Sequence, residues 1–190
     1  MRYGEIRGGA ELAGRARKSP LSVHPGFDIE VQSCLMWDPF AILELDRRFD
    51  LTAAEIERAY LARAVGLHPD TDAAHDEACA ADLNRARQDL KDPETRGNIL
   101  LALLGGPAKD TDRSLPNGFL MQMMEIRGEM ESGTDQHKWS AWGEDQRAQH
   151  EREVGALFEK VVARDPDGAM LKAIRTRLNA WRYIERMLEG

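Results

Sequence analysis

Apolar residues recur along most of this chain at intervals of three and four, with charged residues between them. This spacing joins Ile56, Ala59 and Tyr60 in one segment. It joins Leu83, Ala86 and Leu90 in the next. A period near 3.6 residues is typical of amphipathic helices. Runs of β-branched residues are almost absent, and Ala, Leu, Glu and Arg are abundant. The pattern predicts an all-α fold.

Local signals predict where the first helices begin and end. Asp38 and Pro39 favour the start of a short helix over residues 38–45. Thr52 and Glu55 have the spacing of a capping box, which opens a second helix that Pro69 ends. A third helix is predicted over residues 74–91, and a fourth follows Asp92-Pro93 and ends at Gly105-Gly106. The second and third helices then form an antiparallel hairpin, with His68-Pro69-Asp70 at or near its tip.

The remaining segments divide the chain. Residues 1–36 are rich in Gly and Arg without periodicity, which favours a mobile N-terminal arm. Residues 37–106 form a helical domain, and residues 107–117 form a linker. Residues 118–190 contain three helical patterns, at about 118–131, 142–164 and 167–188, which predict a C-terminal three-helix bundle.

Composition excludes several classes of function. The net charge of −7 and the pI near 5.3 argue against nucleic acid as the main partner. No apolar run approaches the ~20 residues of a membrane span, and the N-terminus lacks the apolar stretch of a signal peptide. Cys34 and Cys79 form neither a CxxC motif nor a disulfide framework. We therefore expect a reducing, cytoplasmic compartment.

The tripeptide His68-Pro69-Asp70 gives little support for catalysis or metal binding. No serine or cysteine has the context of a nucleophile that His68 and Asp70 could activate, so a hydrolase is a remote alternative. The acidic run that includes Asp72, His75 and Asp76 lacks the glycine and terminal glutamate of a calcium loop. No zinc-ligand spacing is present. We expect no metal, no cofactor and no catalytic activity of its own.

The setting of the tripeptide resembles the J domain of DnaJ-type co-chaperones. "DPFAILEL" is similar to their first helix, "EIERAY" followed by "HPD" to their second helix and loop, and "LNRARQDLKDPETR" to their third helix and its turn. The resemblance implies that residues 37–106 are a J domain that binds a DnaK- or HscA-type ATPase chaperone. His68, Pro69 and Asp70 would form the contact, with Arg58 and Arg63 on the preceding helix.

The C-terminal part narrows the resemblance to the HscB family of J proteins, which serve iron–sulfur cluster biogenesis. "FLMQMMEIRGEMES" and "AWRYIERML" carry it. It implies that the bundle binds an IscU-like scaffold protein and that the chain delivers this client to the chaperone. The resemblance implies six client-binding residues, namely Leu120, Met121, Met124, Glu125, Arg127 and Tyr183.

Apolar spacing in residues 119–130 gives a separate reason to expect a partner. Phe119, Met123 and Ile126, with Met130 one turn further, form a stripe wide enough to face a core. Leu120, Met121 and Met124 form a second apolar face beside it. Methionines at helical spacing usually belong to a wide core, but the resemblance favours the interpretation that this second face is exposed and binds the client.

Other readings stay open. The predicted second helix offers only Arg58 and Arg63 where J domains usually carry a row of bases, so electrostatic steering towards a chaperone should be weak. The client could be a protein other than a scaffold, or the chain could be a helical interaction module with a degenerate J domain. His24, His137 and His150 have polar neighbours in the sequence and receive no role.

Overall fold

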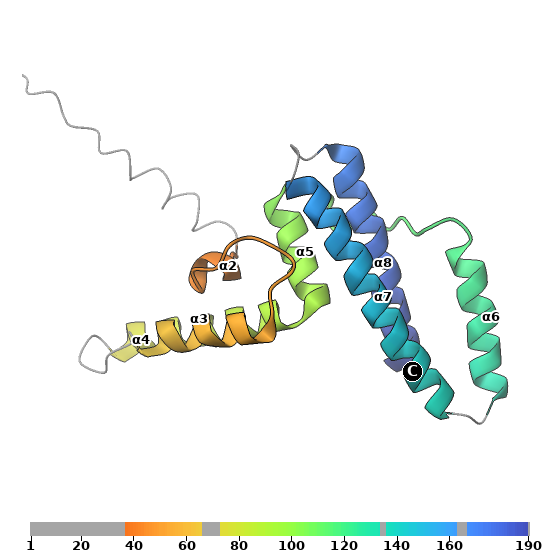
Figure 1. Ribbon diagram of the computed structural model, residues 1–190, viewed down its shortest axis with the longest axis horizontal. Helices are drawn as coiled ribbons and strands as arrows, with labels where there is room; N and C mark the ends of the chain where they lie inside the picture. Colours follow the sequence, from red (N-terminus) through yellow and green to blue (C-terminus); the bar gives the residue numbers. More distant parts are fainter. Residues whose placement is uncertain (1–36, 66–72, 134–135, 163–166, 190) are drawn as a thin grey trace, which may run out of the picture. The chain divides into compact units, whose positions relative to one another are not determined.

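The computed structural model describes residues 37–65, 73–133, 136–162 and 167–189, with the side chains of 73–77, 136 and 162 left out. Every regular element in these ranges is an α-helix, which confirms the all-α prediction (Figure 1). The helices are α2 (Pro39–Ile42), α3 (Ala53–Val65), α4 (Ala73–Lys91), α5 (Pro93–Leu103), α6 (Phe119–Ser132), α7 (Gln136–Val162) and α8 (Gly168–Glu189). The N-terminal arm predicted over residues 1–36 lies outside the described residues. No helix in the described ranges has the length and apolar character that crossing a membrane needs.

α2 begins where the sequence predicts and ends early. The Asp38 side chain accepts hydrogen bonds from the backbone N–H of Phe40 (3.1 Å) and Ala41 (3.2 Å), which caps the helix. The predicted helix over 38–45 is too long, because Glu44 adopts a left-handed backbone with φ 54°. The turn still buries Leu43 in the core.

α3 and α4 form the predicted antiparallel hairpin (Figure 1). The capping box is confirmed, since the Glu55 carboxylate accepts from the Thr52 N–H (2.8 Å) and the Thr52 hydroxyl accepts from the Glu55 N–H (3.2 Å). Across the hairpin, Glu57 accepts from Arg87 (2.9 Å) and Lys91 (2.6 Å). Ionic contacts thus link the exposed side of α3 to α4, while Ile56 is buried beneath.

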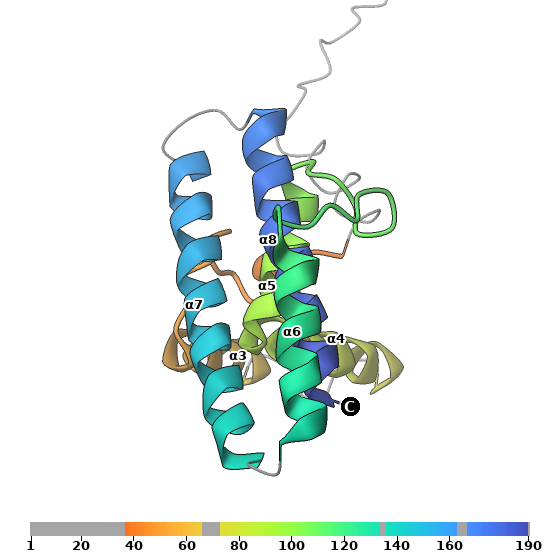
Figure 2. The same ribbon diagram turned by 90° about the vertical axis from the view of Figure 1, so that its right-hand side faces the viewer.

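α8 is the helix on which the others converge. α6 and α8 run in the same direction, and α7 runs antiparallel to both (Figures 1 and 2). α8 packs most extensively on α7, then on α5, and least on α6. α5 approaches α8 closely at Gly97, where an added Cβ would lie 3.0 Å from a methyl group of Leu178. The C-terminal bundle therefore also includes a face of α5.

One hydrophobic core joins the two predicted domains. It contains Phe40, Leu90 and Leu101 from the N-terminal part together with Phe158 and Ile174 from the C-terminal part. The boundaries at 37–106 and 118–190 stay a prediction. Residues 107–117, predicted as a linker, contain no helix and are held along α8, where the side-chain amide of Asn179 donates to two backbone carbonyls of this segment at 2.9 and 3.0 Å.

The start of α7 differs from the prediction. The helix begins at Gln136 and not at residue 142, so that Trp139 and Trp142 both belong to its first turns. Their rings meet edge to face at 6.2 Å, and Trp142 packs against the small core beneath α6. These aromatic contacts stabilise the first turns of α7, where the sequence has neither a recognisable N-cap nor a clear apolar period.

Candidate functional site

α6 divides its apolar residues between two faces. Phe119 and Met123 are buried, at 8% and 2% exposure, against Ala180 and Ile184 of α8, with Ile126 packed at the edge of this small core. This is the stripe predicted to face the core, and the prediction is confirmed for Phe119, Met123 and Ile126. Met130, the fourth predicted member, is half-buried and lies outside this small core.

The second face of α6 lies in solvent. Leu120, Met121 and Met124 are 49%, 70% and 71% exposed. Among the described residues, the exposed large hydrophobic side chains are these three and two on α3. A cluster of large apolar side chains on one side of a short helix is typical of a surface that a protein partner covers. We call Leu120, Met121 and Met124 the α6 apolar face.

Polar side chains border the α6 apolar face. Glu125 and Arg127 are exposed, and Arg127 forms an i,i+4 ion pair with Glu131 at 3.0 Å. Tyr183, on α8, is half-buried and meets the Phe119 ring edge to face at 5.6 Å. The structure thus places all six predicted client-binding residues on α6 and on the α8 surface that packs against it. Their role in binding stays a prediction.

The predicted chaperone-binding residues fall into two groups. His68, Pro69 and Asp70 lie outside the described residues, as do the side chains of the rejected metal candidates nearby. Arg58 and Arg63 are exposed on α3. Arg63 forms an ion pair with Glu44 at 2.6 Å, and Arg58 donates to the Ala54 carbonyl at 3.3 Å, so each already has a partner within the fold.

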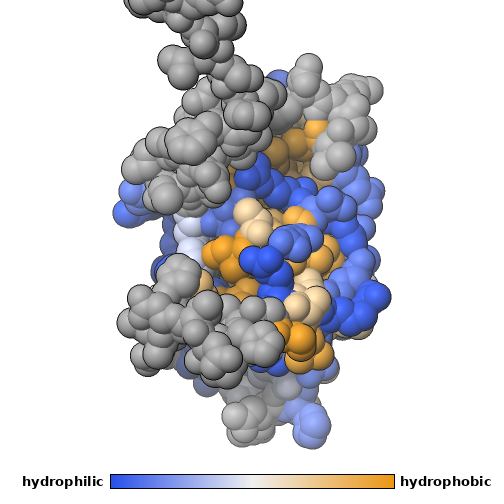
Figure 3. Space-filling view, turned by 90° about the vertical axis from the view of Figure 1, so that its left-hand side faces the viewer, coloured by the Kyte–Doolittle hydropathy of each residue, from blue (hydrophilic) through white to orange (hydrophobic). Residues whose placement is uncertain are grey.

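The same helix carries exposed apolar side chains as well. Leu61 and Val65 are exposed near the C-terminal end of α3. Figure 3 views the side on which α2 and the α3–α4 hairpin lie, and apolar surface there is interrupted by hydrophilic side chains. This composition differs from the row of bases that J domains usually carry on their second helix, as the sequence indicated.

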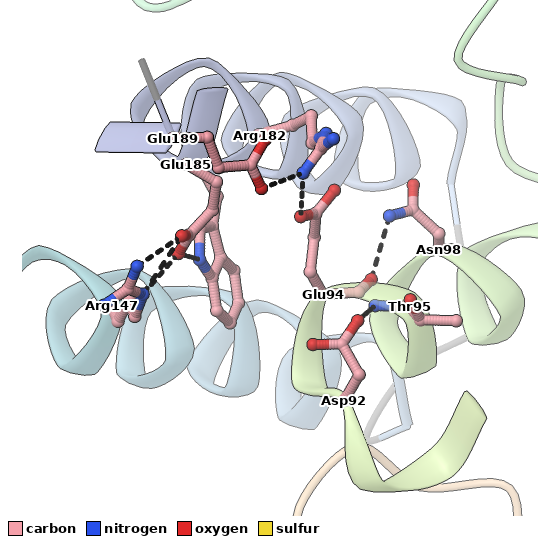
Figure 4. A network of polar contacts seen from close by, with 9 residues as sticks. Asp92, Glu94, Thr95, Asn98, Arg147, Arg182, Glu185 and Glu189 are labelled. Atoms are coloured by element: carbon pink, nitrogen blue, oxygen red, sulfur yellow. Dashed lines mark hydrogen bonds and ion pairs between the residues drawn. The ribbon is translucent and has the colours of Figure 1, made fainter. Parts of the chain in front are cut away.

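A polar network that the sequence analysis missed ties α5, α7 and α8 together (Figure 4). Arg147 of α7 binds the Glu185 carboxylate at 2.7–3.0 Å, and the Trp181 indole N–H donates to the same group at 3.1 Å. Arg182 lies 3.8 Å from Glu94 of α5. Burial raises the pKa of Glu94. Only the i,i+4 pair of Trp181 and Glu185 has a local signal in the sequence.

The burial of His150 differs from what its polar neighbours in the sequence predict. Its neighbours in the sequence are polar, but the structure buries its ring against the Trp181 indole, with the two rings stacked at 6.1 Å. Its Nδ1 makes no hydrogen bond with any described residue. Burial lowers the pKa of His150 and favours the neutral ring. The helix period places His150 on the same side of α7 as Val154 and Phe158, a signal that could have identified it as a core residue.

The candidate site consists of surface features on α6, α5 and α8. In the described part of the chain, no group of three or more His, Cys, Asp or Glu side chains is arranged to hold a metal ion. The features that remain are the α6 apolar face, its polar border and the polar surface between α5 and α8.

Comparisons with known proteins show a similarity to co-chaperones. No family model matches the chain. It is 35% identical over 105 residues to the co-chaperone protein HscB homolog of Mannheimia succiniciproducens, covering 50% of this chain and 61% of that protein. It is 26% identical over 146 residues to the mitochondrial J-type co-chaperone jac1 of Schizosaccharomyces pombe, covering 74% of this chain and 64% of that protein.

The fold is similar to that of a solved HscB structure. The human co-chaperone protein HscB superposes with a TM-score of 0.65 at 19% identity, covering 99% of this chain and 91% of that one. The chain spans less than two thirds of the length of the two relatives named above. In sequence this chain is similar to an HscB homolog and to jac1, and its fold is similar to that of human HscB.

Proposed function

We propose that this protein is a cytoplasmic co-chaperone that stimulates the ATPase of a DnaK- or HscA-type chaperone and delivers an IscU-like iron–sulfur scaffold protein to it. The likeness to HscB and jac1 co-chaperones supports the general role. The iron–sulfur cluster is cargo on the client, and this chain contributes no chemistry to it.

The observation that carries the proposal is the α6 apolar face. Leu120, Met121 and Met124 are exposed although the same helix already has a buried stripe through Phe119 and Met123. Burying three such side chains against a partner contributes about 1.5–3 kcal/mol each when burial is complete. The polar border formed by Glu125 and Arg127 would set the orientation of the client.

The two predicted contacts would bind different partners. The α6 apolar face would hold the scaffold, and the tripeptide at His68 would contact the chaperone. Asp70 would offer its carboxylate to a cation of the ATPase in a charge-assisted hydrogen bond. A co-chaperone accelerates hydrolysis in this way only by binding the hydrolysis-competent state of the ATPase more tightly than the other states.

Single-turnover ATP hydrolysis tests the proposal. The organism's DnaK-type chaperones are mixed with this protein and with the IscU-like scaffold, singly and together. We expect stimulation by the protein alone and greater stimulation when the scaffold is added. A different client would be indicated by two results together. The scaffold would leave the stimulation of ATP hydrolysis unchanged, and this protein would not retain the scaffold in a pull-down.

A second candidate is a helical interaction module whose J domain no longer activates an ATPase. The pairing of Arg63 with Glu44 favours it, because that pair reduces the basic charge that α3 can present. Scaffold binding without stimulation of any DnaK-type chaperone of the organism would support this candidate.

A further inference from the structure

A cavity beside α8 is lined by several positively charged side chains. It has a volume of about 490 Å³ and is lined by residues of α5, of α8 and of the segment between α5 and α6. Two carboxylates face five cationic side chains there, namely Lys109, Arg113, Arg175, Arg182 and Arg186. In a chain with a net charge of −7 this local excess of cations is unexpected.

Arg175 is the most buried of these cations. It is 3% exposed, and its guanidinium donates to the Pro107 carbonyl (2.9 Å) and to the Asn98 side-chain oxygen (2.7 Å). Both acceptors are neutral, and no described carboxylate forms an ion pair with Arg175. Burial lowers the pKa of Arg175, although the charge of Asp112 opposes that shift. A buried cation that makes no direct ion pair is costly, so an anion beside it would be stabilising.

The other cations differ in whether their charge is already neutralised. Arg182 lies 3.8 Å from Glu94 and 3.5 Å from Glu189, and Figure 4 shows it between these carboxylates. Arg113 and Arg186 are exposed, and no ion pair in the described ranges includes either of them. The cavity therefore has a buried cation and further cations at its rim that are available to an anionic ligand.

Two residues connect the cavity with the α6 region. Tyr183 lines the cavity and also contacts Phe119 at the start of α6. Leu115 lines the cavity as well, and it packs against the small core that Phe119 and Met123 form. A protein covering the α6 apolar face could extend past Tyr183 into the cavity.

We propose that this cavity binds a carboxylate-bearing acidic segment of the protein that docks on the α6 apolar face. The inference rests on the proposed function, since it takes the docked client as the source of the carboxylate. Arginine binds carboxylates well because its planar guanidinium can donate two parallel hydrogen bonds. The apolar face would provide burial, and the cavity would select clients that carry acidic residues at the matching distance.

Charge reversal at the rim tests the cavity without disturbing the buried Arg175. The Arg113→Glu/Arg186→Glu variant is compared with Arg152→Glu/Lys160→Glu, which makes the same change in net charge at exposed positions of α7. Binding of the IscU-like scaffold is measured by calorimetry at two salt concentrations, and melting temperatures verify that both variants fold. Leu120→Ala/Met124→Ala serves as the variant that tests the proposed function.

We expect the rim variant to bind the scaffold at least about tenfold more weakly than the α7 variant and to lose most of its salt dependence. Equal binding by the two charge variants, with binding lost in Leu120→Ala/Met124→Ala, would overturn the cavity proposal and leave the proposed function intact. No scaffold binding by the unaltered protein would overturn both.

The cavity could instead bind a small free anion, and inorganic phosphate is the probe for this alternative. Two results together would show that the cavity binds small anions. Millimolar phosphate would raise the melting temperature of the unaltered protein but not of the rim variant, and the rim and α7 variants would bind the scaffold equally. These results would also overturn the proposal.

Discussion

α3 and α6 have almost equal lengths, 13 and 14 residues, and each buries an apolar face, but their remaining side chains make different contacts. Across α3, charged side chains form ion pairs with neighbouring segments, as in the contacts of Glu57 with Arg87 and of Arg63 with Glu44. α6 is held by apolar contacts through Phe119 and Met123. Several charges of α3 are therefore paired within the fold, whereas α6 exposes three large apolar side chains against two on α3.

This difference indicates what each helix offers a partner. Exposed ion pairs contribute at most about 1 kcal/mol each to stability, so those of α3 do little for the fold, but they reduce the positive charge available for docking. A buried methionine contributes several times more, which allows α6 to stay in place through one face. The predictions below test the two regions in order of decreasing effect.

The largest effect is expected at the tip that follows α3. Because Asp70 should supply the charge that meets the chaperone and His68 the loop geometry, Asp70→Asn or His68→Gln should abolish stimulation of the ATPase. Circular dichroism should show unchanged helicity. Full stimulation by either folded variant in single-turnover hydrolysis would contradict the J-domain role.

The next effect concerns the two faces of α6. A Leu120→Ala/Met121→Ala/Met124→Ala variant should lose scaffold binding while its melting temperature stays within a few degrees of the unaltered protein, since exposed truncations cost within about 0.5 kcal/mol. Binding is measured by calorimetry and stability by thermal unfolding.

The matched control is Met123→Ala with Ile126→Ala on the opposite face. Removing the buried Met123 side chain should destabilise the protein by about 2–5 kcal/mol, with a smaller contribution from Ile126. If the triple variant unfolds instead, the α6 apolar face is part of the core. If it stays folded and still binds the scaffold, the client surface lies elsewhere.

Local signals explain which parts of the fold could be predicted from the sequence. Asp38, Thr52 and Asp92 cap helices through contacts two or three residues away, so each start is visible in a short stretch of sequence. The period of α6 also separates its apolar residues into two stripes, but the spacing alone favours a wide core. The resemblance to HscB proteins is what favours an exposed second face. The exposure of Leu120 and Met124 then agrees with the prediction.

Contacts between distant segments explain the rest. The stacking of His150 on Trp181 joins residues of two helices, and the hydrogen bond from Arg175 to Asn98 joins residues 77 positions apart. Polar side chains at such positions are typical of exposed surface when only neighbours in the sequence are considered. The packing of α5 on α8 brings these groups together, and the spacing of apolar residues does not predict which helices pack.

A moderate effect is expected at the start of α3. Two hydrogen bonds with Thr52, from its hydroxyl first and then its backbone N–H, lower the pKa of Glu55 from 4.5 to about 2, and Arg48 acts in the same direction. A carboxyl whose pKa is lower in the folded state stabilises the fold fully above pH 4.5. This stabilisation decreases as the pH falls towards about 2. Thr52→Ala should lower the melting temperature by a few degrees at neutral pH.

Glu55→Gln separates the charge from the hydrogen bonds. Its melting temperature should lie below that of the unaltered protein at neutral pH, and the two should converge as the pH approaches about 2, where the Glu55 carboxyl becomes protonated. Thermal unfolding across this range makes the measurement. A constant difference between the two proteins at every pH would show that the Glu55 charge does not stabilise the start of α3.

The smallest effect is the response of chaperone binding to salt. α3 offers Arg58 and Arg63, and Glu44 already pairs with Arg63 at 2.6 Å, so few long-range attractions exist for salt to screen. The dissociation constant should therefore rise only mildly between low salt and about 0.15 M, where the Debye length is near 8 Å. Glu44→Gln frees Arg63 and should both tighten binding at low salt and steepen its salt dependence. A steep loss of affinity with salt in the unaltered protein would contradict the comparison of α3 with α6, because it would require a basic docking surface outside α3. The arginine-containing residues 1–36 would then be the first segment to test.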